Sequence, residues 1–137
     1  NVEEHPLNET FPGLVIFRFD AELFFANSQK FRDRVRELMK TADPPAKAVL
    51  ADFEAVYDLD LTAADMLKEL ASELAGEEIE LFFARVKTPV RDMMRGSGVE
   101  DAVGPDHFYE SVHAGVDDYL RRHPEGGTAD RPSIGDT

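Results

Sequence analysis

The chain has no cysteine and no tryptophan, and the absence of cysteine excludes several kinds of chemistry at once. Without thiols it can form no disulfide, no thiolate nucleophile and no cysteine-ligated zinc site. No apolar run approaches the roughly 20 residues that a membrane-spanning helix needs, and no secretory signal pattern is visible. These absences favour a domain that folds through a hydrophobic core in a reducing compartment.

Positive charge is also scarce. Lys and Arg total 15 against 28 Asp and Glu, which gives a formal net charge of −13. Such a charge repels nucleic-acid backbones and anionic lipid surfaces, so no nucleic-acid partner is expected. With 137 residues, 42% of them hydrophobic, the chain is long and apolar enough to form one folded domain.

The composition changes at both ends of the chain. Residues 1–12 are polar and contain two prolines, which predicts a lead-in or linker. Residues 124–137 are rich in Gly, Pro and small polar residues, which predicts a disordered tail. The folded domain should therefore span residues 13–123.

Within that domain, predicted strands and helices alternate. Runs rich in β-branched and aromatic residues predict strands at 13–19, 47–53 and 79–84, with a short edge strand at 107–109. Helical spacing and capping residues predict helices at 28–43, 62–76, 88–96 and 111–123. The alternation predicts an α/β fold: a mixed, mainly parallel sheet flanked by about four helices, with 47–53 in its centre.

The turn after the second predicted strand carries the most informative side chains. Asp58 and Asp60 lie in an acidic turn, and Thr62 opens a helix, with Asp65 placed as in a capping box. In open α/β sheets, the loops at the carboxyl ends of strands are where ligands dock. We therefore expect the start of this helix to be exposed and available to a partner.

A basic segment follows the third predicted strand in this otherwise acidic chain. It contains Arg85, Lys87 and Arg91, with Thr88 as the cap of a short helix. If the second and third strands are neighbours, these cations lie next to Thr62 and form a site for an anion or an acidic partner. The alternative is ordinary pairing of these cations with nearby acids on an exposed helix face.

Asp58, Asp60 and Thr62 also match the D-x-D-x-T pattern of aspartyl-nucleophile phosphatases. That chemistry needs the first Asp directly at the end of a buried strand, and here it comes several residues later. The four histidines (His5, His107, His113 and His123) show neither metal-ligand nor triad spacing. The sequence therefore predicts no catalytic residue and no metal site.

Three blocks of sequence together resemble a known family. They are 17–27 (FRFDAELFFAN), 58–65 (DLDLTAAD) and 84–92 (ARVKTPVRD). Over about 13–120 the chain is similar to STAS domains, specifically to the carboxy-terminal cytosolic domains of bacterial sulfate permeases of the SulP type. Three blocks in the same order make the resemblance specific.

The resemblance implies a non-catalytic regulatory domain at the cytoplasmic face of the plasma membrane, tethered to a membrane-spanning domain of the same polypeptide that transports sulfate or another anion. Some family members bind guanine nucleotides and others bind acyl carrier protein, so both are candidate ligands. The alternative is a free-standing anti-sigma factor antagonist. In that branch the motif reads Asp-x-Ser-Gly and a kinase phosphorylates the Ser; here Thr62 and Ala63 replace Ser and Gly, which favours the transporter branch, although Thr62 could still accept phosphate.

Taken together, the sequence predicts one ligand- or partner-binding site. Its members are Asp58, Asp60, Thr62, Ala63, Arg85, Lys87, Thr88 and Arg91.

Overall fold

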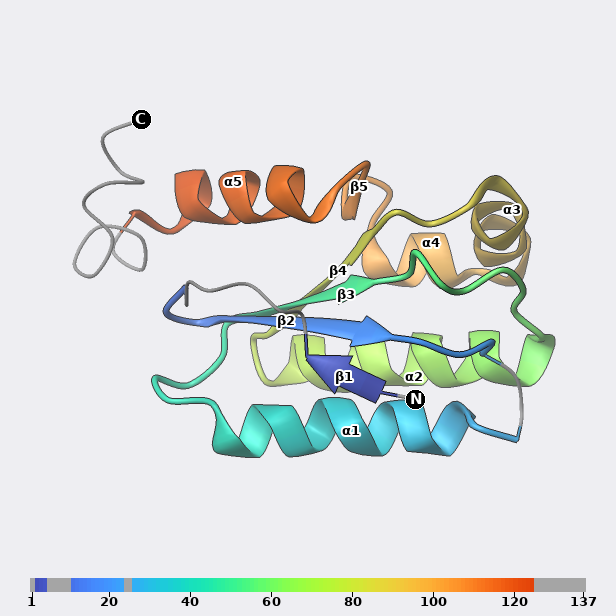
Figure 1. Ribbon diagram of the computed structural model, residues 1–137, viewed down its shortest axis with the longest axis horizontal. Helices are drawn as coiled ribbons and strands as arrows, with labels where there is room; N and C mark the ends of the chain where they lie inside the picture. Colours follow the sequence, from blue (N-terminus) through green and yellow to red (C-terminus); the bar gives the residue numbers. More distant parts are fainter. Residues whose placement is uncertain (1, 5–10, 24–25, 125–137) are drawn as a thin grey trace.

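The computed structural model describes residues 2–4, 11–23 and 26–124 of the chain (Figure 1). The predicted tail beyond Pro124 and most of the predicted lead-in lie outside the described residues, as does His5. Two described parts of the 1–12 segment belong to the fold: Val2–Glu4 forms strand β1, and Phe11 is buried. The lead-in is therefore more than a linker, because it supplies an edge strand and a core side chain that its polar composition did not reveal.

A five-stranded sheet lies at the centre of the structure, in the order β1-β2-β3-β4-β5. Its strands are β1 (Val2–Glu4), β2 (Leu14–Phe19), β3 (Ala48–Asp52), β4 (Glu80–Ala84) and β5 (Phe108–Tyr109). β1 pairs antiparallel with β2, and every other pairing is parallel. All of β3 is buried, since it has a strand on either side and helices over both faces. The mixed, mainly parallel sheet and the central position of the second predicted strand are confirmed.

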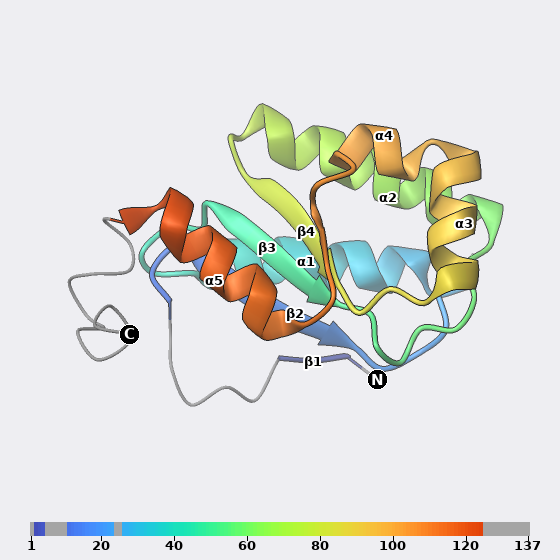
Figure 2. The same ribbon diagram turned by 90° about the horizontal axis from the view of Figure 1, so that it is seen from above.

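Helices cover both faces of the sheet, but unequally. They are α1 (Ser28–Thr41), α2 (Leu61–Gly76), α3 (Thr88–Ser97), α4 (Val99–Val103) and α5 (Val112–Arg122). Side chains from α1 to α4 share one hydrophobic core, whereas α5 packs alone on the opposite face (Figure 2). α4 was not predicted, because its five residues are too few to show helical periodicity; Gly98 and Gly104, both with positive φ, bracket it.

The larger core contains a chain of phenylalanine rings that fixes the end of β3. Phe31 of α1 makes edge-to-face contacts with Phe17 and Phe53, and Phe53 contacts Phe83 of β4 at a centroid distance of 5.0 Å. All four side chains are fully buried, and burying each one contributes about 2–3 kcal/mol. Because Phe53 directly follows β3, this cluster holds the start of the β3–α2 loop in place.

The parallel strands give the sheet two distinct edges along the strand direction. We call the edge where β2, β3 and β4 end, at Phe19, Asp52 and Ala84, the carboxyl edge. β1 runs in the opposite direction, so its first residue, Val2, lies beside Phe19 at this same edge. The last turn of α5 lies at the other edge, where Arg122 pairs with Glu80 at the start of β4.

Candidate functional site

Buried apolar residues anchor the β3–α2 loop, at the carboxyl edge, to the hydrophobic core. Phe53, Val56 and Leu59 are each at most 1% exposed, and the Phe53 N–H donates to the carbonyl of Ala84 at 2.9 Å. Leu59 also forms an isolated parallel bridge with Leu23. These contacts leave the residues between and after them facing outward at a defined position.

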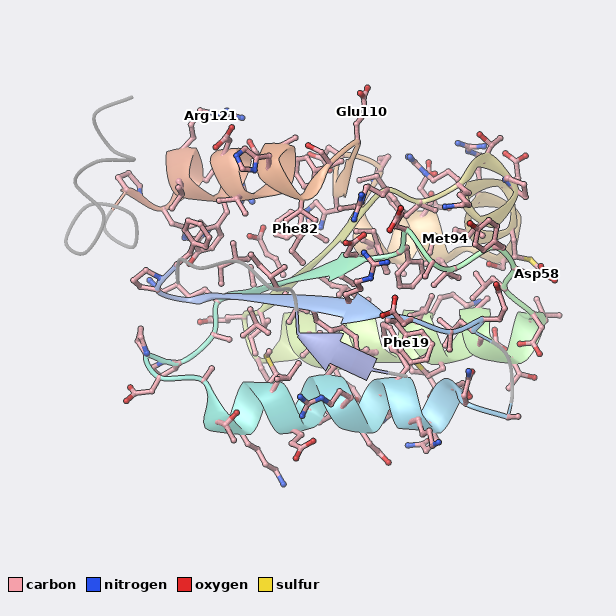
Figure 3. All side chains as sticks on the ribbon, in the orientation of Figure 1. Phe19, Asp58, Phe82, Met94, Glu110 and Arg121 are labelled. Atoms are coloured by element: carbon pink, nitrogen blue, oxygen red, sulfur yellow. The ribbon has the colours of Figure 1, made fainter. Side chains whose placement is uncertain are left out.

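Carboxylates hold the outer part of the loop. The backbone N–H groups of Tyr57 and Asp58 both donate to one oxygen of Glu22, each at 2.8 Å, and the Leu59 N–H donates to the side chain of Asp58. No described Lys or Arg pairs with Glu22 or Asp58. Figure 3 shows Asp58 at the end of the molecule toward which β2 and β3 point. The loop is therefore ordered by acids whose charge stays on the surface.

The cap of α2 differs from the prediction. Asp60, not Thr62, is the N-cap: its backbone is extended, and its side chain accepts the N–H of Ala63 at 2.9 Å. The helix begins at Leu61, so the predicted capping box of Thr62 and Asp65 is wrong. Asp60 was available three residues before Ala63, and the capping preference of Asp is at least that of Thr. Thr62 is exposed in the first turn, whereas Ala63 is fully buried and lies beneath the surface to which it was assigned.

Two large apolar side chains frame this helix start. Tyr57 is 63% exposed and Leu61 is 60% exposed; no other large hydrophobic side chain in the described part of the chain is as open. We call residues 57–61 the tip. Neither residue is among the predicted site residues, although large apolar side chains among turn acids were a usable signal.

Arg85 does not face the tip. Its guanidinium makes a two-point contact with Asp52, at 2.7 and 3.2 Å, and Asp52 is fully buried. Arg18 approaches the same carboxylate at 3.7 Å, and both arginines approach Glu54. The hydrogen bond to Asp52 raises the pKa of Arg85, so the guanidinium stays charged. We call Arg18, Asp52, Glu54 and Arg85 the arginine cluster.

Lys87 is the predicted cation nearest to the tip. Its ammonium donates to the backbone carbonyl of Glu54 and lies 4.5 Å from the centre of the Tyr57 ring. Lys87, rather than Thr88, is the N-cap residue of α3, and no side chain accepts a hydrogen bond there. Thr88 is the first helical residue and is exposed, with Pro89 next to it. Lys87 thus stabilises the β3–α2 loop through contacts with Glu54 and Tyr57.

Arg91 faces away from the tip, toward α4 and β5. It donates to Glu100 at 2.7 Å, and its guanidinium lies 3.8 Å from the centre of the Phe108 ring. This hydrogen bond is the main reason that the pKa of Glu100 lies below its ordinary value. The predicted grouping of Arg91 with Thr62 is therefore not formed.

The geometry consequently favours one of the two alternatives raised for the basic segment. Arg85, Lys87 and Arg91 are each engaged by internal acceptors. Residues 52–65 hold five acids and no Lys or Arg. An anion at the tip would meet net negative charge, so the local pairing explains these cations better than an anion site.

The arrangement required for a phosphatase is also missing from the loop. The residue at the end of β3 is Asp52, which is buried against Arg85, while Asp58 comes later and is exposed. Among the described residues, no group of three or more His, Asp or Glu side chains could hold a metal ion. His107 packs its ring against Phe82 at 4.3 Å instead.

An open hollow of about 620 Å³ lies between α5 and the strands β4 and β5. Phe82, His107, Tyr109, Asp118 and Arg122 are among its lining residues, and none of the predicted site residues is. Tyr109 donates to Asp118, which lowers the pKa of Asp118, while burial raises the pKa of Tyr109. Figure 3 shows Arg121 on α5, far from Asp58 at the tip.

Comparison with known proteins gives a consistent result. A family model described as "STAS domain" matches residues 5–115. A probable sulfate transporter of Mycobacterium tuberculosis is 32% identical over 122 residues, which is 89% of this chain and 22% of the transporter. The chain thus spans about a fifth of that relative.

Solved structures share the fold at lower identity. The STAS domain of a SulP transporter from Vibrio cholerae superposes with a TM-score of 0.71 at 16% identity, covering 88% of this chain and 91% of that one. The anti-sigma factor antagonist SpoIIAA of Bacillus superposes with a TM-score of 0.68 at 14% identity, covering 88% and 97%. No helix in the described part of the chain is long and apolar enough to cross a bilayer.

Proposed function

Since this chain belongs to the STAS domain family, we propose that it is the non-catalytic regulatory domain of an anion permease, with sulfate as the first anion to test. The observation that carries the proposal is the sequence similarity to a sulfate transporter over 89% of the chain. In this proposal the domain follows a membrane-spanning part of the same polypeptide and lies at the cytoplasmic face of the membrane.

The contacts of the described residues favour one surface, the tip, as the place where this domain would meet its partner. Apart from buried Leu59, the tip is exposed; it is held in a defined conformation by Glu22 and Asp60 and offers apolar and acidic groups. A domain regulates a transporter only if its contacts differ between the transporter's states. The tip has the exposure that such a contact needs, whereas Arg85 and Arg91 stabilise the domain itself.

The test is removal of residues 13–120 from the parent gene in a strain that depends on this permease for anion uptake. We expect sulfate uptake to change while the protein reaches the membrane in normal amount. Removal of residues 125–137, which lie outside the family match, is the matched control and should leave uptake unaltered. Unchanged uptake without residues 13–120, at normal membrane abundance, would count against the proposal.

The likeness in fold to SpoIIAA keeps a second candidate, a free-standing antagonist that binds an anti-sigma factor. The two candidates differ in the gene: an open reading frame that starts near Asn1 favours the antagonist, and one that continues upstream through several apolar segments favours the permease. Phosphorylation of Thr62 stays a prediction for either. Its side chain is exposed, but Asp58, Asp60 and Asp65 are close in sequence and oppose a dianionic group. Guanine nucleotide and acyl carrier protein likewise stay candidate ligands.

A further inference from the structure

The hollow beside α5 lies on the sheet face that α5 covers alone, away from the tip. Its volume of about 620 Å³ is within the range of roughly 300–1,000 Å³ that ligand pockets occupy. Phe82 and Tyr109 belong to the hydrophobic cluster under α5, and the His107 and Tyr109 rings lie 4.3 and 5.7 Å from that of Phe82. His107 and Tyr109 are only partly buried. The hollow therefore offers aromatic surface to a ligand.

Negative charge surrounds this aromatic surface. Four acids and two arginines line the hollow. Arg121 and Arg122 are both paired with acids that line it. Asp106 and Asp117 are exposed, and neither pairs with a Lys or Arg in the described part of the chain. The hollow therefore favours a cationic group, and an anion would meet repulsion there.

A guanidinium group suits these surroundings better than a compact ammonium group. It is planar, it stacks on aromatic rings, and it can form two parallel hydrogen bonds to one carboxylate. The domain already makes this contact twice near β5. The guanidinium of Arg122 lies 5.1 Å from the centre of the Phe82 ring, and that of Arg91 lies 3.8 Å from the centre of the Phe108 ring. A ligand's arginine side chain can stack in the same way on the partly buried rings of the hollow.

The hollow borders a free edge of the sheet. The N–H groups of Phe83 and Arg85 donate to the carbonyls of His107 and Tyr109, each at 2.9 Å. Since successive carbonyls of a strand point in opposite directions, the Phe108 carbonyl points away from β4, to the side where the described chain has no further strand. A strand added there would lie about 4.8 Å from β5 and would place alternate side chains on the α5 face, next to the hollow. β5 has only two residues, so side-chain contacts must supply much of the affinity.

We propose that β5 and the hollow bind an extended, arginine-bearing segment of a partner protein. The segment pairs with the backbone of Phe108, and its arginine enters the hollow, where Asp106 and Asp117 face the guanidinium. Residues 125–137 of this chain do not fit, because they contain three acids and one arginine, and a second copy would bring a net charge of −13. This surface is separate from the tip, and the inference does not depend on the proposed function.

An NMR titration of the whole 137-residue chain tests the binding. The probe is the peptide acetyl-Thr-Val-Arg-Val-Thr-amide, and its matched control has Glu in place of Arg. We expect saturable shifts of the amides of 106–110 and 114–122, with affinity roughly tenfold or more higher for the Arg peptide. Equal affinities, shifts confined to other residues, or no shifts up to roughly 10 mM peptide overturn the proposal.

A capped single residue, acetyl-arginine methylamide, separates strand addition from capture of a small cation. It carries the same guanidinium but lacks the flanking strand. We expect it to bind at least roughly threefold more weakly than the peptide, because it loses backbone hydrogen bonds to β5. Equal affinity would show that the hollow takes a small organic cation, and would overturn the binding of an extended segment.

Two charge variants test the acids assigned to the guanidinium. Asp106→Asn with Asp117→Asn should lower the affinity for the Arg peptide by roughly threefold or more. Asp33→Asn with Asp65→Asn removes the same charge from exposed positions of α1 and α2, on the opposite face of the sheet, and should leave the affinity unchanged. An equal effect of both pairs would overturn the assignment, because attraction would then come from the overall charge of the chain.

Discussion

The tip and the arginine cluster lie side by side at the carboxyl edge, yet they use their polar groups in opposite ways. In the cluster, Arg18 and Arg85 converge on Asp52, whose side chain is fully buried. At the tip, Leu61 is mostly exposed, and among the described residues the Asp58 side chain accepts only the backbone N–H of Leu59. The predicted binding site combined residues of both regions.

The difference shows that the presence of charged side chains in a segment is a poor guide to where a binding surface lies. A cation that is held by a buried carboxylate has already exchanged its hydration for an internal partner, so it offers little to a ligand. An exposed apolar side chain has made no such exchange and gains by burial against a partner. The availability of a group, rather than its type, separates the tip from its neighbour.

The largest expected difference is between two leucines of the tip. Leu59 is 1% exposed and Leu61 is 60% exposed. Leu59→Ala should lower the free energy of unfolding by about 3 kcal/mol, because it leaves a cavity under the loop. Leu61→Ala should change it by less than about 0.5 kcal/mol. Urea unfolding of the two variants measures both values, and a similar loss for each would show that Leu61 is part of the core.

The next comparison is between two acids of the arginine cluster. Asp52→Ala removes a buried carboxylate from between two arginines and should cost about 2–3 kcal/mol in the free energy of unfolding. Glu54 contacts the same arginines but is 45% exposed, so Glu54→Ala should cost less than about 1 kcal/mol. Urea unfolding again provides the measurement. Equal costs would mean that the cluster is as solvent-exposed as the tip.

A smaller effect tests which residue caps α2. Asp60→Ala should cost about 1 kcal/mol, because the Ala63 N–H loses its acceptor. Thr62→Ala should be within about 0.5 kcal/mol of the parent, since Ala suits an exposed helical position well. Thermal and urea unfolding of the two variants decide between them. The reverse order would restore Thr62 as the cap.

The smallest effect concerns the pH dependence of the pair between Arg91 and Glu100. The pKa of Glu100 is lowered in the folded state, chiefly by the hydrogen bond from Arg91. Its contribution to stability is therefore present above its ordinary pKa and is lost as pH falls through the folded value. NMR titration of the Glu100 carboxyl should show the lowered pKa, and Arg91→Met should move it back toward the ordinary one. A normal pKa for Glu100 would mean that Arg91 is available to a ligand.

Much of the fold follows from local pattern. The dense apolar runs predicted β2, β3 and β4, and the predicted helix at 111–123 matches α5 within one residue at each end. The N-cap of α2 was predicted two residues too late, at Thr62 instead of Asp60, since both side chains suit that position. Asp58 and Asp60 of the predicted site lie together at the tip. Arg91 instead points toward α4, where it pairs with Glu100.

The order of residues by itself determined the alternation of strands and helices, the central strand and the likeness to STAS domains, because these depend on short-range spacing and on side-chain type. Only the tertiary structure decided which charged side chains are paired inside the fold. Arg85 meets Asp52 across 33 positions of sequence, and Glu22 reaches the Tyr57 backbone across 35. Such pairings depend on which strands become neighbours, and that is set by the packing of the whole domain.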